Sequence, residues 1–280
     1  MTVQFSPAIA AKERGSGMFS VKAIDLESLG ERASPIVVLD HFRVRGLPFA
    51  PHPHAGFSAV TCVLEDSAAA LRSRDSLGND IVVGPGGIVW TQAGSGVMHH
   101  EIPAEADREL HGLQIFVNLS ARNKLLPPKM LWLASSEVPE RRSEAGDRVR
   151  VLAGSFEGLA SPLVPAEPLD LLDVTLRRAI GFTLPEDHNA LVYVIKGRIL
   201  LRADGRAQEV ASEHAVALHG DGGRVTLAAR EAAHVVILSG AEIREPIVVD
   251  GPFIMNDRSQ VEGAIARYRA GSMGRLEPLS

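Results

Sequence analysis

Short apolar segments recur along most of the chain and are separated by Gly, Pro, Asp and Asn. In residues 18–120 these segments include IVVLDHF, SAVTCVL and HGLQIFVNL, and a second series in residues 148–250 includes LDLLDVTL, ALVYVIKGRILL and AHVVILSG. Short segments at regular spacing, bounded by turn residues, are typical of strands in a β-sandwich or β-barrel. The pattern therefore predicts an all-β chain with two successive sets of strands.

The two series resemble a degenerate internal repeat. SAVTCVLED can be laid over ALVYVIKG, and GPGGIVWTQAGSG resembles HAVALHGDGG in position and turn content. Residues 123–147 between them carry the prolines and charges of a linker, although LLPPKMLWL within it could pack on a barrel. With 280 residues, of which 45% are hydrophobic, the chain is long enough for two cores. We expect an N-terminal domain over 1–133 and a C-terminal domain over 134–280.

In the last part of the chain the apolar residues recur with the period of a helix. In SQVEGAIARYRAG, Val261, Ala264, Ile265 and Tyr268 recur at helical spacing, and the segment ends in Gly271. This pattern predicts one short amphipathic helix that lies against a barrel.

Composition excludes several classes of function. The net charge of -5 and the pI near 6.1 argue against a surface for direct nucleic-acid binding, which needs clustered Lys and Arg. The single cysteine, Cys62, cannot form an internal disulfide, and its apolar surroundings predict a small buried side chain. No stretch has the length of a membrane span or the apolar core of a signal peptide. We therefore expect a cytoplasmic protein without a membrane partner.

Two pairs of polar residues carry the candidate chemistry. His52 and His54 stand two residues apart, as do His99 and Glu101. In an extended strand the two side chains of each pair would therefore point to the same side of the sheet. His100 would then point to the opposite face. Either pair alone is more typical of a loop or a solvated turn. Together, three nitrogens and one carboxylate suit a divalent transition metal such as iron, manganese, nickel, copper or zinc. Four protein ligands would leave positions open for dioxygen and a substrate oxygen.

Several longer motifs indicate a family. HPHAGFSAVTCVLE, RDSLGND, PGGIVWTQAGSGVMHHE, HGLQIFVNL and GPFIMND resemble the pirin family of bicupins, and the resemblance covers nearly the whole chain. It implies two stacked cupin-type β-barrels of the jelly-roll kind, with a C-terminal barrel that holds no metal. It also implies one metal ion, Fe(II), in the N-terminal barrel, with His52, His54, His99 and Glu101 as ligands.

Some positions depart from the usual pirin pattern. Residues 55–58 read AGFS where the family commonly has Arg and an acidic residue, and Val89 and Gln92 replace Gln and Thr. The missing acid at Ser58 would remove one proton-handling group, so Glu101 would have to act both as ligand and as base. We expect a shifted substrate preference or weaker activity.

Other candidate residues have weaker signals. Gln114 could point toward the pocket or away from it, and for Trp90, Phe57 and Met98 core packing is the default. In the C-terminal half no pair of histidines has the spacing of the metal motif, and we expect surface or core roles for these four: His188, His214, His219 and His234.

The resemblance implies two alternative functions. The first is an oxidoreductase of the quercetin (flavonol) 2,3-dioxygenase type, which would act on a small aromatic or flavonol-like substrate and dioxygen, with Glu101 accepting the substrate proton. The second is a redox-sensing regulatory protein that binds a transcription factor or a metabolic enzyme without turnover. A cupin that acts on an ordinary small metabolite is a third reading.

Overall fold

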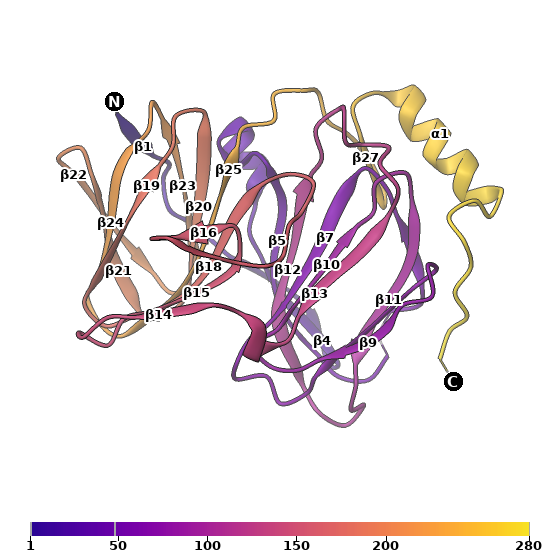
Figure 1. Ribbon diagram of the computed structural model, residues 1–280, viewed down its shortest axis with the longest axis horizontal. Coiled ribbons are helices and arrows are strands. Elements are labelled where there is room, and N and C mark those ends of the chain that lie inside the picture. Colours follow the sequence, from indigo (N-terminus) through magenta and orange to yellow (C-terminus); the bar gives the residue numbers. More distant parts are fainter. Residues whose placement is uncertain (1, 48, 280) are drawn as a thin grey trace.

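The computed structural model describes residues 2–47 and 49–279, which form two β-barrels lying side by side (Figure 1). Each barrel is built from a large antiparallel sheet and a four-stranded sheet. One short α-helix, α1 (Arg258–Arg269), follows near the C-terminus. The predictions of an all-β fold with two barrels and of a C-terminal helix are confirmed.

The N-terminal barrel combines a seven-stranded sheet with a four-stranded one. The larger sheet has the order β13 (Lys129–Leu133), β10 (Ile88–Gln92), β7 (Phe57–Val63), β12 (Leu110–Asn118), β5 (Ile36–Val44), β4 (Phe19–Ala23) and β3 (Lys12–Ser16). The smaller sheet has the order β6 (His52–His54), β11 (Val97–Pro103), β8 (Leu71–Asp75) and β9 (Asp80–Val83). Part of the predicted linker thus forms an edge strand, β13, of this barrel.

The C-terminal barrel repeats this plan. Its large sheet has the order β1 (Val3–Phe5), β23 (His214–Gly220), β20 (His188–Lys196), β25 (Ala233–Ala241), β18 (Leu169–Leu176), β15 (Arg148–Ala153) and β14 (Glu140–Arg142), with β2 (Ile9–Ala10) also paired to β23. Its small sheet has the order β19 (Ala179–Leu184), β24 (Gly223–Ala229), β21 (Arg198–Ala203) and β22 (Arg206–Ala211).

Short elements connect and cover the barrels. They are the 3-10 helices η1 (Leu26–Ala33) and η2 (Ser135–Glu137), and the two-residue or three-residue strands β16 (Ser155–Phe156), β17 (Leu159–Ala160), β26 (Val248–Asp250) and β27 (Phe253–Met255). Within the described ranges, no helix is long and apolar enough to cross a membrane.

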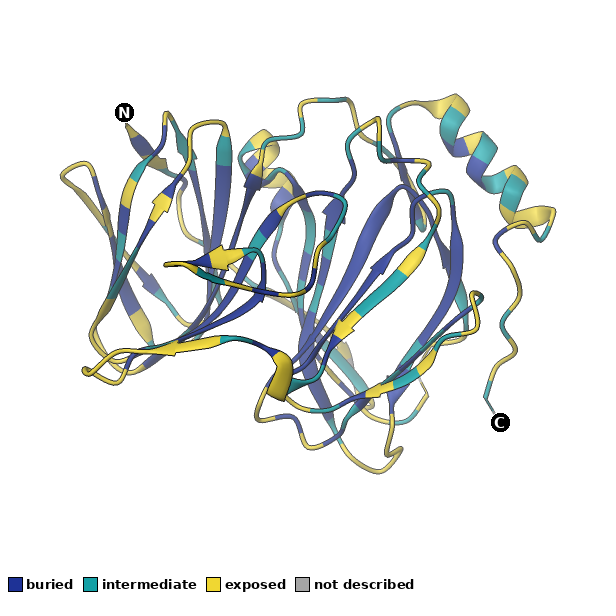
Figure 2. Cartoon of the chain, in the orientation of Figure 1, coloured by how far each residue is buried: buried dark blue, intermediate teal, exposed yellow. Residues whose placement is uncertain are grey.

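The main hydrophobic core lies between the two barrels. It joins side chains of the N-terminal large sheet, such as Val60, Cys62 and Ile115, to side chains of the C-terminal large sheet, such as Leu191 and Leu238. The central strands of these sheets, such as β7 and β20, are buried along most of their length (Figure 2). Cys62 is buried and unpaired, as its apolar run predicts. Strands that are buried on both faces read as continuous apolar runs, and β7 is one of them.

The interiors of the two barrels differ. Apolar residues such as Val192, Leu201 and Leu227 fill the C-terminal barrel. The apolar cluster inside the N-terminal barrel is smaller and includes Phe42 and Leu71, both of which also line a cavity. The N-terminal barrel therefore offers the room for a site.

Each end of the chain packs on the barrel that is formed mainly by the other half of the sequence (Figure 1). The N-terminal strands β1 and β2 pair with β23 of the C-terminal barrel. The C-terminal β27 and α1 instead pack on the N-terminal barrel, where Phe253 and Met273 form a cluster with Ala55 and Met98. Each barrel is thus completed by a segment from the far end of the sequence, and the division at residues 133 and 134 stays a prediction.

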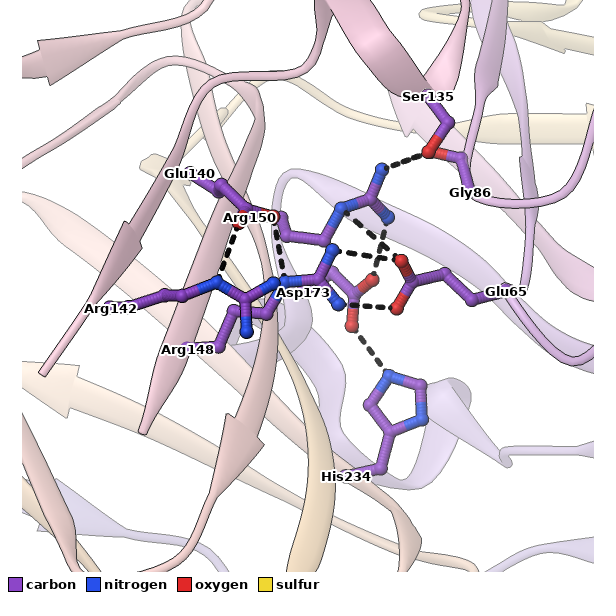
Figure 3. A network of polar contacts seen from close by, with 9 residues as sticks. All are labelled: Glu65, Gly86, Ser135, Glu140, Arg142, Arg148, Arg150, Asp173 and His234. Carbon is purple, nitrogen blue, oxygen red and sulfur yellow. Dashed lines mark hydrogen bonds and ion pairs between the residues drawn. The ribbon is translucent and has the colours of Figure 1, made fainter. Parts of the chain in front are cut away.

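A polar network also connects the barrels (Figure 3). Glu65, which follows β7, accepts two hydrogen bonds of 2.7 and 2.8 Å from Arg148 on β15. The neighbouring Arg150 donates to the buried Asp173 at 3.1 Å, and Asp173 also contacts His234 at 2.5 Å. Asp173 raises the pKa of His234 against the opposing effect of burial. His234 is therefore a partnered structural histidine, as its sequence context predicts.

Candidate metal centre and cavity

Three imidazoles meet inside the N-terminal barrel. His52 and His54 lie on β6 and His99 lies on β11, and the antiparallel register pairs His99 directly with His52. One ligand atom from each of the three lies within 4.8 Å of the others. His52 Nε2 and His99 Nε2 are 3.0 Å apart. The two strands thus bring the two sequence motifs to one point.

The hydrogen bonds of these rings fit a metal ion. His52 Nδ1 lies 2.9 Å from the carbonyl oxygen of Ala50, which can only accept, so Nδ1 carries the proton and Nε2 keeps its lone pair. The Nδ1 atoms of His54 and His99 are buried and have no hydrogen-bond partner in the described part of the chain. The Nε2 atoms of His52 and His99, 3.0 Å apart, are close enough for one metal ion to bind both.

Burial keeps the imidazoles of His54 and His99 neutral. It lowers the pKa of His54 to about 3, with a further contribution from His52. Burial, together with the neighbouring histidines, also lowers the pKa of His99 well below its usual value. A metal needs neutral imidazole ligands, so these nitrogens are available to an ion at neutral pH.

Glu101 lies on the same face of β11 as His99 and lines the same cavity. Its carboxylate accepts hydrogen bonds from Thr61 Oγ1 at 2.5 Å and from Ser73 Oγ at 3.3 Å. Burial raises the pKa of Glu101 to about 7, although both hydroxyl groups act in the opposite direction. The ligand atoms grouped within 4.8 Å are those of the three imidazoles, so Glu101 as fourth ligand stays a prediction.

A cavity of about 360 Å³ opens onto these groups. Its walls are mainly apolar and aromatic, and its polar lining groups are the three histidines, two carboxyl groups and one amide. The lining residues are Phe19, Val21, Asp40, Phe42, Val44, Phe49, His52, His54, Leu71, His99, Glu101, Leu110, Gln114 and Phe116.

The structure gives the positions of four residues that had weaker sequence signals. Gln114 lines the cavity, and its Nε2 donates to the Val60 carbonyl oxygen at 3.3 Å. Trp90, Phe57 and Met98 are buried but do not line the cavity, which agrees with core packing.

The interpretation of Ser58 was wrong. Ser58 shares the face of β7 that carries Val60 and Cys62, and these two side chains pack between the barrels. An acid at this position would therefore face away from the three histidines. The departure at 58 removes no proton-handling group from the cavity.

Sequence reasoning did not find the apolar walls of the cavity, such as Phe49, or the polar residues Thr61, Ser73 and Asp40. A single Thr in the apolar run SAVTCVL, and a single Asp in IVVLDHF, were the available signals. Asp40 lines the cavity, and burial raises its pKa. Ser73 stands opposite Glu101 in the β8–β11 register, which the sequence alone does not give.

Comparison with known families agrees with this geometry. The family model described as Pirin matches residues 20–117, and that of the Pirin C-terminal cupin domain matches residues 171–274. The chain belongs to the pirin family. Among relatives of this pirin, a Pseudomonas aeruginosa protein named "Putative quercetin 2,3-dioxygenase" is 34% identical over 253 residues, covering 86% of this chain and 87% of that protein.

Two further relatives cover most of the chain. Pirin from Homo sapiens is 31% identical over 245 residues, which span 86% of this chain and 83% of the human protein. The crystal structure of quercetin 2,3-dioxygenase from Acinetobacter baumannii matches with a TM-score of 0.86 at 25% identity, over 98% of this chain and 99% of that one. The bicupin architecture is thus shared along the whole chain.

Proposed function

We propose that this pirin holds one divalent transition metal, Fe(II), and oxidises a flavonol-like substrate with dioxygen, as quercetin 2,3-dioxygenases do. His52, His54, His99 and Glu101 would hold the ion. The observation that carries this proposal is that three imidazoles, of which His54 and His99 are buried and have a lowered pKa, open onto one apolar cavity together with a carboxyl group of raised pKa. The names of the Pseudomonas and Acinetobacter relatives support the choice of substrate class.

The cavity suits a small aromatic molecule. Its volume of about 360 Å³ falls in the range of small-molecule sites, and Phe19, Phe49 and Phe116 supply flat apolar walls. Glu101 and the three histidines line this same cavity, so a substrate with a hydroxyl group on an aromatic ring would direct that hydroxyl toward Glu101. Apolar walls would exclude water from the reacting end.

Bound iron would supply Lewis-acid and redox chemistry at this point. Glu101 would accept the proton of the substrate hydroxyl, because burial raises the pKa of this carboxyl group to about 7 and so makes it a stronger base. Thr61 and Ser73 would orient the carboxylate by donating hydrogen bonds to its two oxygens. Thr61 has one hydroxyl hydrogen, which goes to Glu101 at 2.5 Å, the shorter distance, since the other acceptor near it, Gln114 Oε1, lies at 3.2 Å.

Oxygen uptake with quercetin tests the proposal. The iron-loaded protein should consume oxygen in proportion to its metal content, and Glu101→Gln should lower the rate per bound iron by about 100-fold or more, because it removes the base. Glu144→Gln, at an exposed carboxylate, is the matched control and should behave as wild type. If iron, nickel, cobalt, manganese and copper forms all consume no oxygen, the dioxygenase proposal fails and the regulatory role is favoured.

A further inference from the structure

Beyond His99, one edge of strand β11 has no backbone partner among the residues that the structure describes. Pairing with β6 extends from Val97 to His99 and stops there, whereas pairing with β8 on the other side continues to Pro103. The residue that would face His100 on the β6 side is Pro51, which has no N–H group to donate. The segment before β6 therefore lies across this edge without ladder hydrogen bonds.

The side chain of His100 replaces the missing ladder contact. Its Nε2 lies 2.9 Å from the carbonyl oxygen of Phe49, and the residue is only 2% exposed. A carbonyl oxygen only accepts, so Nε2 must carry the proton and donate. His100 Nδ1 is buried without a partner in the described residues, which makes the bond to Phe49 the polar contact of this ring. His100 does not line the cavity.

Phe49 forms one wall of the cavity mouth. Its ring lines the cavity and yet is 45% exposed, which places it where the cavity meets solvent. It packs edge-to-face on Phe19, which also lines the cavity, with ring centroids 4.9 Å apart and an interplanar angle of 84°. The position of the Phe49 backbone therefore sets where this pair of aromatic rings stands.

We propose that His100 is a positioning residue for substrate binding, which holds the Phe49 carbonyl and thereby fixes the aromatic wall of the cavity mouth. His99 and His100 then divide two tasks between the two faces of one strand. His99 faces the metal centre, and His100 shapes the entrance for an aromatic substrate. This inference rests on the proposed function, because it takes a planar aromatic molecule as the ligand.

A double-mutant cycle separates this role from a general structural one. His100→Leu removes the donor and keeps the buried volume, Phe49→Ala removes the aromatic wall, and His100→Gln restores an N–H group at the same reach. His100→Leu and Phe49→Ala should each raise the KM for quercetin, or its Kd, by about three- to tenfold. The double variant should be no worse than Phe49→Ala alone, and His100→Gln should restore most of the affinity. If His100→Leu does not fold, His100→Ala takes its place.

Two results would overturn the role. One is additivity of the two substitutions, and the other is equal KM values in the Leu and Gln variants. Hydrogen exchange gives a second readout that needs no substrate: the amides of Phe49 and Ala50 should exchange faster in His100→Leu than in His100→Gln or wild type. If wild type binds no flavonol, the proposed function fails, and hydrogen exchange still decides the role of His100.

Discussion

At the scale of single residues, the adjacent histidines 99 and 100 have unlike surroundings. His99 meets two other imidazoles, and His100 meets a backbone carbonyl. His99→Ala should lower iron affinity by at least about 10- to 100-fold, because a loss of this size already follows when a residue that only hydrogen-bonds to a metal ligand is removed. His100→Ala should keep its metal. Iron per chain, measured after equilibration with a competing chelator, checks both, and a depleted His100→Ala beside a loaded His99→Ala would reverse the assignment.

At this scale, the alternation of side chains along a strand was enough to predict the main residues of the site. The alternation of strand side chains grouped His52, His54, His99 and Glu101, and all four line the cavity of the structure. Asp40 could not be found in this way, because its place depends on its pairing with Gln114, far along the chain, as β5 and β12 come together. Ser58 was misread for a related reason, since the face of β7 that looks toward the cavity is set by the packing of the barrels.

At the scale of elements, the C-terminal strand β27 passes very close to the turn that follows His54. Gly56 has φ +86°, and a Cβ atom there would lie 1.9 Å from the Ile254 carbonyl oxygen. Lys124, fully buried, donates to the carbonyl oxygens of Gly56 and Ile254 at 2.8 and 2.9 Å. The chain end is thereby fixed against the strand that carries two of the imidazoles.

Gly56→Ala should release this contact. The substitution adds a clash with backbone to the strain of a positive φ, so we expect a loss of about 3 kcal/mol in the free energy of unfolding. Gly78→Ala is the control, because Gly78 has φ +95° and open space where the methyl group of alanine would stand, and it should cost about 1 kcal/mol. Urea unfolding measures both losses. Equal losses in the two variants would show that the approach of β27 is unimportant.

The strands and the helix were more predictable from the sequence than the pairing of the strands in the sheets. The apolar runs predicted the strands, and the helical period predicted α1, which begins after the N-cap Asp257. The crossing of the chain ends was not predicted, because a short strand such as β1 has no local signal for the barrel it will join. Long-range pairing of this kind is decided by which sheet edge is open.

At the scale of the whole molecule, a chain of four hydrogen-bonded side chains crosses from one barrel to the other. Tyr193 Oη lies 2.9 Å from His41 Nδ1, His41 Nε2 lies 2.6 Å from His111 Nε2, and His111 Nδ1 lies 2.7 Å from Asp66. Because Asp66 accepts, His111 donates to it, His41 donates to His111, and Tyr193 donates to His41. This direction requires both imidazoles to be neutral.

Acid should therefore weaken the junction of the barrels. Burial lowers the pKa of His41 to about 3. Protonation of His111 and the positive charges of Lys22 and Arg43 act in the same direction, and Asp66 opposes them. The folded state then binds fewer protons than the unfolded chain between about pH 3 and pH 6.5, so the stability from this group is present above pH 6.5 and is lost as the pH falls below it.

His41→Gln tests this linkage, because an amide can donate to His111 and accept from Tyr193 without titrating. The slope for one group is at most about 1.4 kcal/mol per pH unit, so the free energy of unfolding of wild type should fall by about 2 kcal/mol more than that of His41→Gln between pH 7 and pH 5. Titrating groups that do not contact His41 cancel in this difference. His214→Gln, at a partly exposed histidine bonded to the Ser212 carbonyl oxygen, is the control and should follow wild type. The free energies of unfolding of wild type and His41→Gln could instead differ by the same amount at pH 7 and at pH 5. That result would mean that the neutral state of His41 does not stabilise the junction between the barrels.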